Sequence, residues 1–116
     1  MHELGIANSV LDAARAEAQL RPEMKLTKIV IRVGDLAGVD RDSLSFCFEA
    51  LVKNTNLESV VLEIERREQR NRCPRCSREF EVVHFDTACP GCGERMTVFV
   101  SGNELELAYL EMEEDL

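Results

Sequence analysis

Apolar residues along the chain follow two spacings, and each spacing predicts a type of secondary structure. Where they recur every three or four residues, the pattern is typical of an amphipathic helix. Where they are β-branched and alternate with polar residues, the pattern predicts a strand. The predicted elements, in chain order, are a helix over 4–20, a strand over 27–33, a helix capped by Asp40 or Asp42 that closes at 54–56, and strands over 59–65 and 104–112.

The same spacings identify the side chains that we expect to be buried. Pro22 ends the first helix, because the residue before a proline leaves the α region. In the second helix we interpret Cys47 as a small core residue rather than a reactive thiol. The positions on the predicted apolar faces are Leu4, Ala7, Val10, Leu11, Ala14 and Ala18 in the first helix, Leu44, Cys47, Phe48 and Leu51 in the second, and Ile29, Ile31, Val33, Val60, Leu62, Ile64, Leu105, Leu107 and Tyr109 in the strands.

Four of the five cysteines form two Cys-x-x-Cys pairs separated by twelve residues. Each pair predicts a tight turn, for which the neighbouring proline and glycine residues are suited. Two such turns make a tetrahedral site of four thiolates, which suits structural zinc and leaves no open position for a substrate. A redox pair is the alternative, but the doubled motif favours zinc, and His84 between the pairs is expected to be a surface residue or to support the site from outside. The predicted zinc ligands are Cys73, Cys76, Cys89 and Cys92.

The order of the elements predicts an α+β fold with an inserted metal module. Two helices and three strands can pack as a two-layer sandwich of two helices on a three-stranded sheet. Because the last strand carries apolar residues that need the same core, the cysteine segment is predicted to be a zinc-ribbon-like insertion. The predicted domains are an α/β domain over 1–66 plus 102–116 and a zinc-binding module over 67–101.

Composition and charge narrow the classes of function. Hydrophobic residues make up 45% of the chain, which is enough for a folded core, and no run approaches the ~18 apolar residues of a membrane span. The formal net charge of −8 disfavours nucleic acid and membrane surfaces as partners. Cysteines at metal spacing and an amino terminus unlike a secretory leader indicate a reducing cytoplasm.

The amino terminus carries a second candidate metal site. The Met1 amine, backbone amide nitrogens and the His2 imidazole can lie in one plane, a geometry that suits Ni(II) or Cu(II) rather than zinc. Carboxylates of Glu3 and Asp40 could add oxygen ligands. On spacing alone, an ordinary solvated histidine is the alternative. With two histidines and no nucleophile motif, the sequence indicates a protein that is not an enzyme.

Several short motifs occur in this chain in a definite order, namely Met1-His2-Glu3-Leu4, the strand and turn over 31–39, Phe46-Cys47-Phe48-Glu49, the two cysteine pairs, and Gly102-Asn103-Glu104-Leu105. Together they resemble the HypA/HybF family, the nickel metallochaperones of [NiFe]-hydrogenase maturation. The resemblance covers essentially the whole chain. It implies a protein that transports Ni(2+), carries structural Zn(2+), and works with a nickel-handling GTPase to supply the hydrogenase large-subunit precursor or, in some organisms, urease through its accessory proteins.

The resemblance also assigns roles to single residues. His2 matches the family's nickel-binding histidine, and Glu3 matches the adjacent acidic residue of the nickel site or partner contact. Asp40 matches an acidic residue that some members place near the nickel. The four cysteines of the two pairs match the zinc ligands.

Two other classes of function stay open at this point. The arginines over 66–78 favour, as the alternative, a zinc-ribbon nucleic-acid-binding or regulatory module, although no aromatic residues for base stacking lie beside them. A metal-dependent hydrolase that uses His2 and carboxylates is the third class, but a general base next to an open metal site is lacking.

Overall fold

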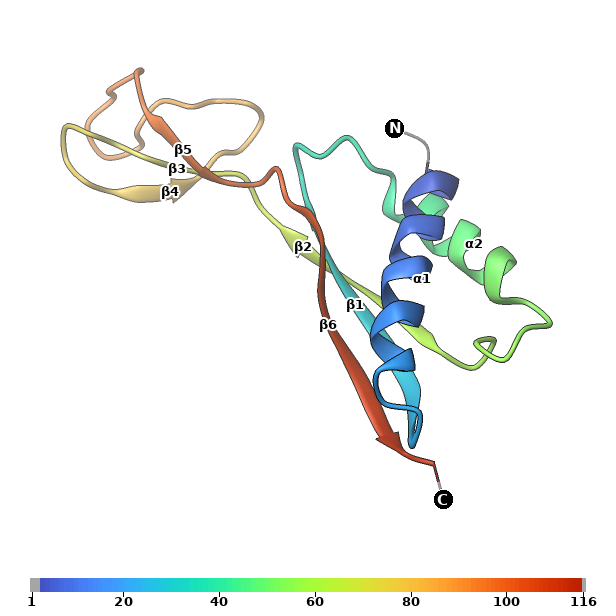
Figure 1. Ribbon diagram of the computed structural model, residues 1–116. Helices are drawn as coiled ribbons and strands as arrows, with labels where there is room; N and C mark the ends of the chain where they lie inside the picture. The colour runs from blue at the N-terminus through green and yellow to red at the C-terminus, as the bar shows by residue number, and fades with distance from the viewer. Residues whose placement is uncertain (1–2, 116) are drawn as a thin grey trace. The chain divides into compact units, whose positions relative to one another are not determined.

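The computed structural model describes residues 3–115 and divides into two compact units. The first, here called the helix–sheet unit, comprises Met1–Arg32, Gly38–Glu65 and Glu106–Leu116. The second, the cysteine unit, comprises Val33–Ala37 and Arg66–Leu105. Each unit is therefore assembled from segments that lie far apart in the sequence (Figure 1).

The helix–sheet unit contains two helices on one side of a three-stranded sheet (Figure 1). The strand order is β2-β1-β6, so β1 is the central strand. These elements confirm the predicted α+β fold. Their bounds are α1 (Glu3–Gln19), β1 (Met24–Gly34), α2 (Arg41–Val52), β2 (Val61–Arg67) and β6 (Leu105–Glu114).

The core of this unit forms between β1 and the helices. Ile29 and Ile31 are fully buried on β1, which confirms the predicted apolar face of that strand. In α1, Ala7, Leu11 and Ala14 are buried as predicted, whereas Val10 and Ala18 are only partly buried. At the first turn Leu4 is exposed and Ile6 is buried instead. At a helix end, a spacing of three or four residues is compatible with either Leu4 or Ile6 on the buried face, because a single turn contains too few residues to define the direction of that face.

The second helix buries a narrower stripe than we predicted. Leu44 and Phe48 are buried as expected, and the helix begins after Asp40, one of its two predicted caps. Buried positions in α2 recur every four residues from Leu44, which places Cys47 and Leu51 at the edge of the stripe. Cys47 is consequently only half-buried, and its interpretation as a core residue is wrong.

The last strand does not alternate regularly. Burial changes phase between Leu107 and Ala108, since these neighbours are both partly buried. Tyr109 was predicted to share a face with Leu105 and Leu107, but it is exposed. This phase change is what a strand shows when one extra residue interrupts its pairing.

Ion pairs cross the outer face of the sheet from the central strand to both neighbours. The two cations on β1, Lys28 and Arg32, are four residues apart. The glutamates that they contact on β6, Glu106 and Glu111, are five residues apart, which agrees with the phase change in β6. Hydrogen bonds to the flanking glutamates raise the pKa of both cations. Lys28 pairs with Glu63 and Glu111, and Arg32 pairs with Glu65 and Glu106.

The cysteine unit holds a second three-stranded sheet that the sequence analysis did not predict. Its order is β4-β3-β5, and both outer strands run antiparallel to β3. The β3–β5 register shifts between Arg70 and Asn71, so Val100 has no partner and forms a bulge. The strands are β3 (Arg70–Arg72), β4 (Glu79–Glu81) and β5 (Val98–Ser101).

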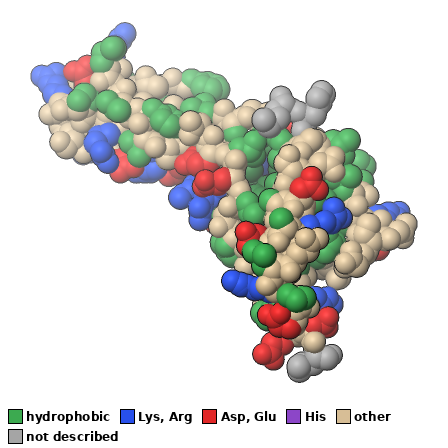
Figure 2. All heavy atoms as spheres, viewed as in Figure 1, with side chains coloured by type: hydrophobic (Ala, Val, Ile, Leu, Met, Phe, Trp, Pro, Cys, Tyr) green, Lys and Arg blue, Asp and Glu red, His purple; other side chains and the backbone are tan. Residues whose placement is uncertain are grey.

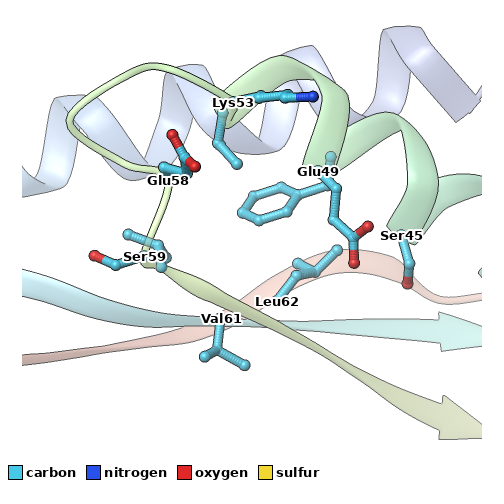
Figure 3. Close-up of a pocket in the computed structure, with 10 residues that line it drawn as sticks. Ser45, Glu49, Lys53, Glu58, Ser59, Val61 and Leu62 are labelled. Atoms are coloured by element: carbon cyan, nitrogen blue, oxygen red, sulfur yellow. The ribbon is translucent and has the colours of Figure 1, made fainter.

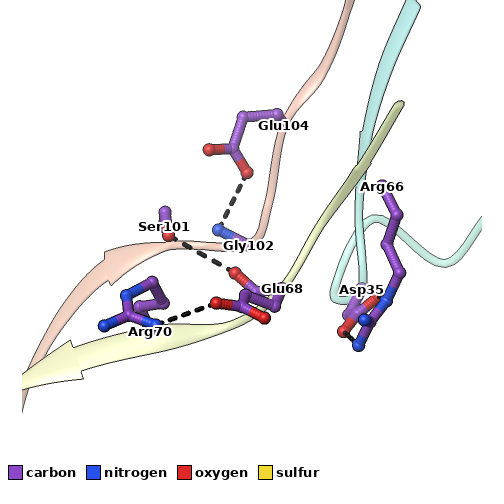
Figure 4. A network of polar contacts seen from close by, with 7 residues as sticks. All are labelled: Asp35, Arg66, Glu68, Arg70, Ser101, Gly102 and Glu104. Carbon is purple, nitrogen blue, oxygen red and sulfur yellow. Dashed lines mark hydrogen bonds and ion pairs between the residues drawn. The ribbon is translucent and has the colours of Figure 1, made fainter. Parts of the chain in front are cut away.

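Two glycines allow the backbone of the cysteine unit to approach itself closely. A Cβ on Gly34 would lie 2.1 Å from the carbonyl oxygen of Gly102, so no side chain fits there. Gly102 itself has a φ of 125°, which favours glycine. Figure 4 shows the Gly102 N–H donating to Glu104 at 2.8 Å, and the hydroxyl of Ser101 donating to the Glu68 carbonyl at 3.3 Å.

Candidate metal sites

The two cysteine pairs form matching turns in the cysteine unit. In the first, Cys73 N–H donates to the Arg78 carbonyl at 2.8 Å, and Ser77 N–H donates back to the Cys73 carbonyl at 2.8 Å. The second repeats this with Cys89, whose N–H donates to the Glu94 carbonyl at 2.9 Å and whose carbonyl accepts from Gly93 at 2.8 Å. Both turns close with a left-handed residue, Ser77 at φ 66° and Gly93 at φ 78°.

These turns bring all four predicted zinc ligands together. Their sulfur atoms lie within 4.8 Å of one another, with Cys73 Sγ 3.6 Å from Cys92 Sγ and Cys76 Sγ 3.5 Å from Cys89 Sγ. Tetrahedral zinc with Zn–S bonds of about 2.3 Å needs sulfur pairs about 3.8 Å apart. The cluster therefore fits a four-thiolate zinc site.

The backbone at the second turn favours a thiolate. Burial of Cys89 opposes ionisation, but the backbone N–H groups of Cys92 and Gly91 donate to its sulfur and lower its pKa to about 6. At Cys92 the N–H of Glu94 favours the thiolate, yet the hydrogen bond to Cys73 and burial prevail and raise the pKa to about 11. A divalent cation at the centre would displace the remaining protons, because only thiolates act as ligands.

His84 does not belong to this cluster. It is exposed and lies at the tip of a two-residue turn that Val83 and Asp86 close, with Asp86 N–H donating to the Val83 carbonyl at 3.1 Å. Both residues at the tip are left-handed, with φ of 53° at His84 and 61° at Phe85. The prediction of a surface position for His84 is confirmed. Within residues 3–115, the cluster of metal-ligating side chains consists of the four cysteines alone.

A buried asparagine beside the cluster was missed by the sequence analysis. Asn71 on β3 is only 4% exposed, and its Nδ2 donates to Thr97 Oγ1 at 3.0 Å. Thr97 Oγ1 in turn donates to the carbonyl of Thr87 at 2.5 Å. This chain of bonds ties β3 to the segments on both sides of the second cysteine turn. An asparagine in a short strand gives no sequence signal for such a role.

The candidate nickel site is described only in part. Met1 and His2 lie outside the described residues. Glu3 lies in the first turn of α1, and one of its carboxylate oxygens accepts from the Asp40 N–H at 3.2 Å. Asp40 Oδ1 accepts from Ser43 N–H at 3.1 Å and so caps α2. The fold thus brings Glu3 against the backbone of Asp40, and one oxygen of each carboxylate already accepts a hydrogen bond.

Three of the six arginines that favoured a nucleic-acid module, Arg66, Arg70 and Arg72, are paired with carboxylates. Figure 4 shows Arg66 against Asp35, with bonds of 2.8 and 2.6 Å, and Arg70 against Glu68 at 2.8 Å. Arg70 also reaches Glu79 at 3.4 Å. Within the cysteine unit, seven Lys and Arg residues are balanced by seven Asp and Glu residues. A neutral unit in which half of these arginines are paired has no net positive charge to attract phosphates.

A cavity of about 510 Å³ opens in the helix–sheet unit. It lies between α2 and β2, where Figure 3 shows Glu49 and Leu62 facing each other. Its ionisable residues are Glu49, Lys53 and Glu58, and it has neither a histidine nor a cysteine.

Comparison with known proteins identifies the family. The family model described as "Hydrogenase/urease nickel incorporation, metallochaperone, hypA" matches residues 1–112. The chain belongs to the HypA family. Proteins named hydrogenase maturation factor HypA from Chlorobaculum tepidum and Geobacter metallireducens are 41% and 39% identical to it over 113 residues, which cover 97% of this chain and all of each relative. HypA proteins are metallochaperones, so a non-catalytic role in hydrogenase maturation agrees with the prediction.

Two solved structures have the same fold. The solution structure of the nickel metallochaperone HypA from Helicobacter pylori gives a TM-score of 0.65 at 23% identity, covering 99% of this chain and 100% of that one. A second solution structure of a HypA protein gives 0.68 at 23% identity, covering 97% and 96%. Among the described residues, no helix is long and apolar enough to cross a membrane.

Proposed function

We propose that this protein binds Ni(II) at its amino terminus and delivers it, with a GTPase partner, during maturation of [NiFe]-hydrogenase. The observation that carries the proposal is the family match, which extends from residue 1 through both cysteine pairs. The relatives' names support hydrogenase as the recipient, and the family description also includes urease, whose accessory proteins are the second candidate partners.

The nickel ligands in this proposal are the Met1 amine, backbone amides and the His2 imidazole, with Glu3 and Asp40 as oxygen donors. Planar nitrogen donors suit Ni(II). The hydrogen bonds that Glu3 and Asp40 already accept support a secondary role for both. A nickel ion would compete with those hydrogen bonds for the carboxylate oxygens. The oxygen coordination of the nickel is therefore incomplete, which suits a protein that must release its metal.

The four cysteines hold zinc in this proposal, and the zinc is structural. All four positions around the metal are filled by thiolates, so the ion supplies folding energy rather than chemistry. The nickel-binding domain is then 1–66 plus 102–116, and the zinc module is 67–101. A reducing cytoplasm is the compartment that keeps such thiolates available.

A shift of the amino group tests the nickel site directly. Adding two residues, Gly-Ser, before Met1 removes the amine from its chelating position, and we expect the affinity for Ni(II) to fall at least tenfold. Calorimetric titration of protein with a native amino terminus gives the reference. The same Gly-Ser added after Leu116 is the matched control and should leave the affinity unchanged. Equal affinities for all three proteins would contradict the proposed ligand set.

The proposed binding to a nickel-handling GTPase leads to a separate prediction for Glu3. A carboxylate at the start of α1 tunes the association rate with a charged partner, so Glu3→Lys should slow binding to the nickel-handling GTPase several-fold at low salt. Kinetics of the metal-free proteins at two ionic strengths measure this. Glu113→Lys makes the same charge change on β6 and serves as control. If both variants associate as fast as the parent protein, Glu3 is not part of the interface.

A further inference from the structure

The two cysteine turns share one backbone pattern but differ in their side chains at two equivalent positions. In each turn the N–H of the first cysteine donates to the carbonyl of the fifth residue after it, which is Arg78 in the first turn and Glu94 in the second. The second residue after that cysteine is Arg75 in the first turn and Gly91 in the second. The first turn therefore has two arginines where the second turn has a glycine and a glutamate.

Arg78 of the first turn reaches across to the glycine of the second turn. A Cβ built on Gly91 would lie 3.0 Å from Nε, 3.1 Å from Cζ and 3.5 Å from Cδ of Arg78. The guanidinium group thus lies against the backbone of Gly91, and it has room there because glycine has no side chain. An arginine at this position, as at the equivalent Arg75, would fill the same space.

This contact places a positive charge beside the metal-ligating sulfurs. The Gly91 N–H donates to Cys89 Sγ at 3.4 Å. Because Arg78 contacts the residue that contacts the sulfur, its guanidinium lies within about one Debye length of that sulfur, ~10 Å at 0.1 M salt. Arg78 is exposed, in the part of the molecule where Figure 2 shows Lys and Arg side chains at the surface. Among the described residues of this unit, it is not one of the three arginines that pair with a carboxylate.

The equivalent glutamate is used differently. Oε1 of Glu94 accepts from the Met96 N–H at 3.1 Å, so this carboxylate is bound within the segment that follows its own turn. Of the two equivalent side chains, the cation contacts the opposite turn and the anion makes a local hydrogen bond. Four thiolates around a divalent zinc ion leave a net charge of 2− on the cluster, which a nearby cation stabilises.

We propose that Arg78 is a positioning residue of the four-cysteine site, and that its guanidinium, held against Gly91, stabilises the thiolates electrostatically and slows the loss of zinc. This inference rests on the proposed zinc site. A cation next to a thiolate lowers its basicity, and a less basic thiolate is a weaker nucleophile towards protons and electrophiles. Arg78 thereby helps a protein that must release its nickel to keep its zinc.

The rate of zinc transfer to 1,10-phenanthroline, an uncharged chelator, tests the role of the charge. Zinc-loaded Arg78→Gln should lose its metal at least threefold faster than the parent protein at low salt, and uncharged iodoacetamide should alkylate its cysteines faster by a similar factor. Arg78→Lys keeps the charge and should behave as the parent protein does. The difference should vanish in 1 M NaCl, where the Debye length is about 3 Å. Arg67→Gln makes the same charge change on β2, outside both cysteine turns, and is the matched control.

Gly91→Ala tests the contact between the turns. The backbone of Gly91 is not left-handed, and the three atoms nearest to an added Cβ all belong to the flexible Arg78 side chain. Alanine should therefore displace the guanidinium and leave the turn intact, so zinc should be released as fast as from Arg78→Gln. The double variant should be no faster than either single variant, because both changes remove one interaction.

Every other outcome contradicts the proposal or the zinc site itself. Parent-like rates in Arg78→Gln or in Gly91→Ala would refute the role of the contact. An acceleration that persists in 1 M NaCl, or that Arg78→Lys shows equally, would assign Arg78 to packing. Arg78→Gln that is purified without zinc would show that Arg78 builds the site rather than retains its metal. If the parent protein contains no zinc, the proposed zinc site fails, whereas equal rates from zinc-loaded proteins refute this inference alone.

Discussion

Replacing Cys76 with serine should release the metal from the cysteine cluster and unfold residues 67–99, while the helix–sheet unit stays folded. The reason is the small apolar core of the cysteine unit. Its buried cluster consists of Cys73, Phe80 and Cys89, with Val82 packed against it, so two of its members are themselves ligands. In small zinc-binding peptides the metal contributes about 10 kcal/mol of folding free energy, far more than two apolar side chains provide.

The metal content of Cys76→Ser, measured by native mass spectrometry, and amide exchange over both units check this expectation. Cys47→Ser is the matched control, because Cys47 lies in α2 outside the cluster and its loss should leave the metal in place. Stoichiometric zinc in Cys76→Ser would show that the cluster does not need all four thiolates. Unfolding of the helix–sheet unit in the same variant would show that the two units do not fold independently.

The long elements of this chain could be predicted from the sequence because their patterns repeat. The central strand β1 contains a run of β-branched residues, and α2 is preceded by an aspartate whose side chain can reach the backbone three residues on. The cysteine cluster was equally predictable, since two Cys-x-x-Cys pairs admit few geometries. In each case several residues support the same conclusion, so one misplaced side chain changes little.

The short strands could not be predicted, because they contain too few residues for a pattern to repeat. The strands β3, β4 and β5 have only three or four residues each, which is too few for an alternating pattern to be distinguished from chance. Tyr109 was misplaced because one change of phase in β6 moves every later side chain to the other face. The exposed Phe85 was also missed, since the sequence gives no sign of a left-handed turn without glycine or asparagine.

The net charge of the whole chain did not predict the net charge of each unit. The net charge of −8 was the sequence argument against nucleic acid, but the cysteine unit, where the arginines lie, is neutral. The neutrality of this unit and the carboxylate partners of Arg66 and Arg70 are the more local arguments against nucleic acid. The same separation of charge divides the proposed work between the units. The acidic unit holds Glu3 and Asp40, the two carboxylates of the proposed nickel site.

Replacing His2 with alanine should abolish the stoichiometric Ni(II) site and leave the zinc content and the fold intact. The imidazole is the one strong side-chain donor in the proposed ligand set, and the carboxylates of Glu3 and Asp40 already accept hydrogen bonds within the fold. An unperturbed histidine has a pKa of about 6.5, so the Ni(II) affinity of the parent protein should fall as the pH drops below that value and protons compete with the metal.

His84→Ala is the matched control, because His84 is the only other histidine and is exposed on the cysteine unit. Calorimetric titrations at pH 7.5 and pH 5.5 should show tight binding and strong pH dependence for the parent protein and for His84→Ala, and neither for His2→Ala. When all three proteins are loaded with zinc before the titration, any heat that remains in His2→Ala measures nickel bound elsewhere. Equal affinity in His2→Ala and the parent protein would place the nickel site away from the amino terminus and refute the proposed mechanism of delivery.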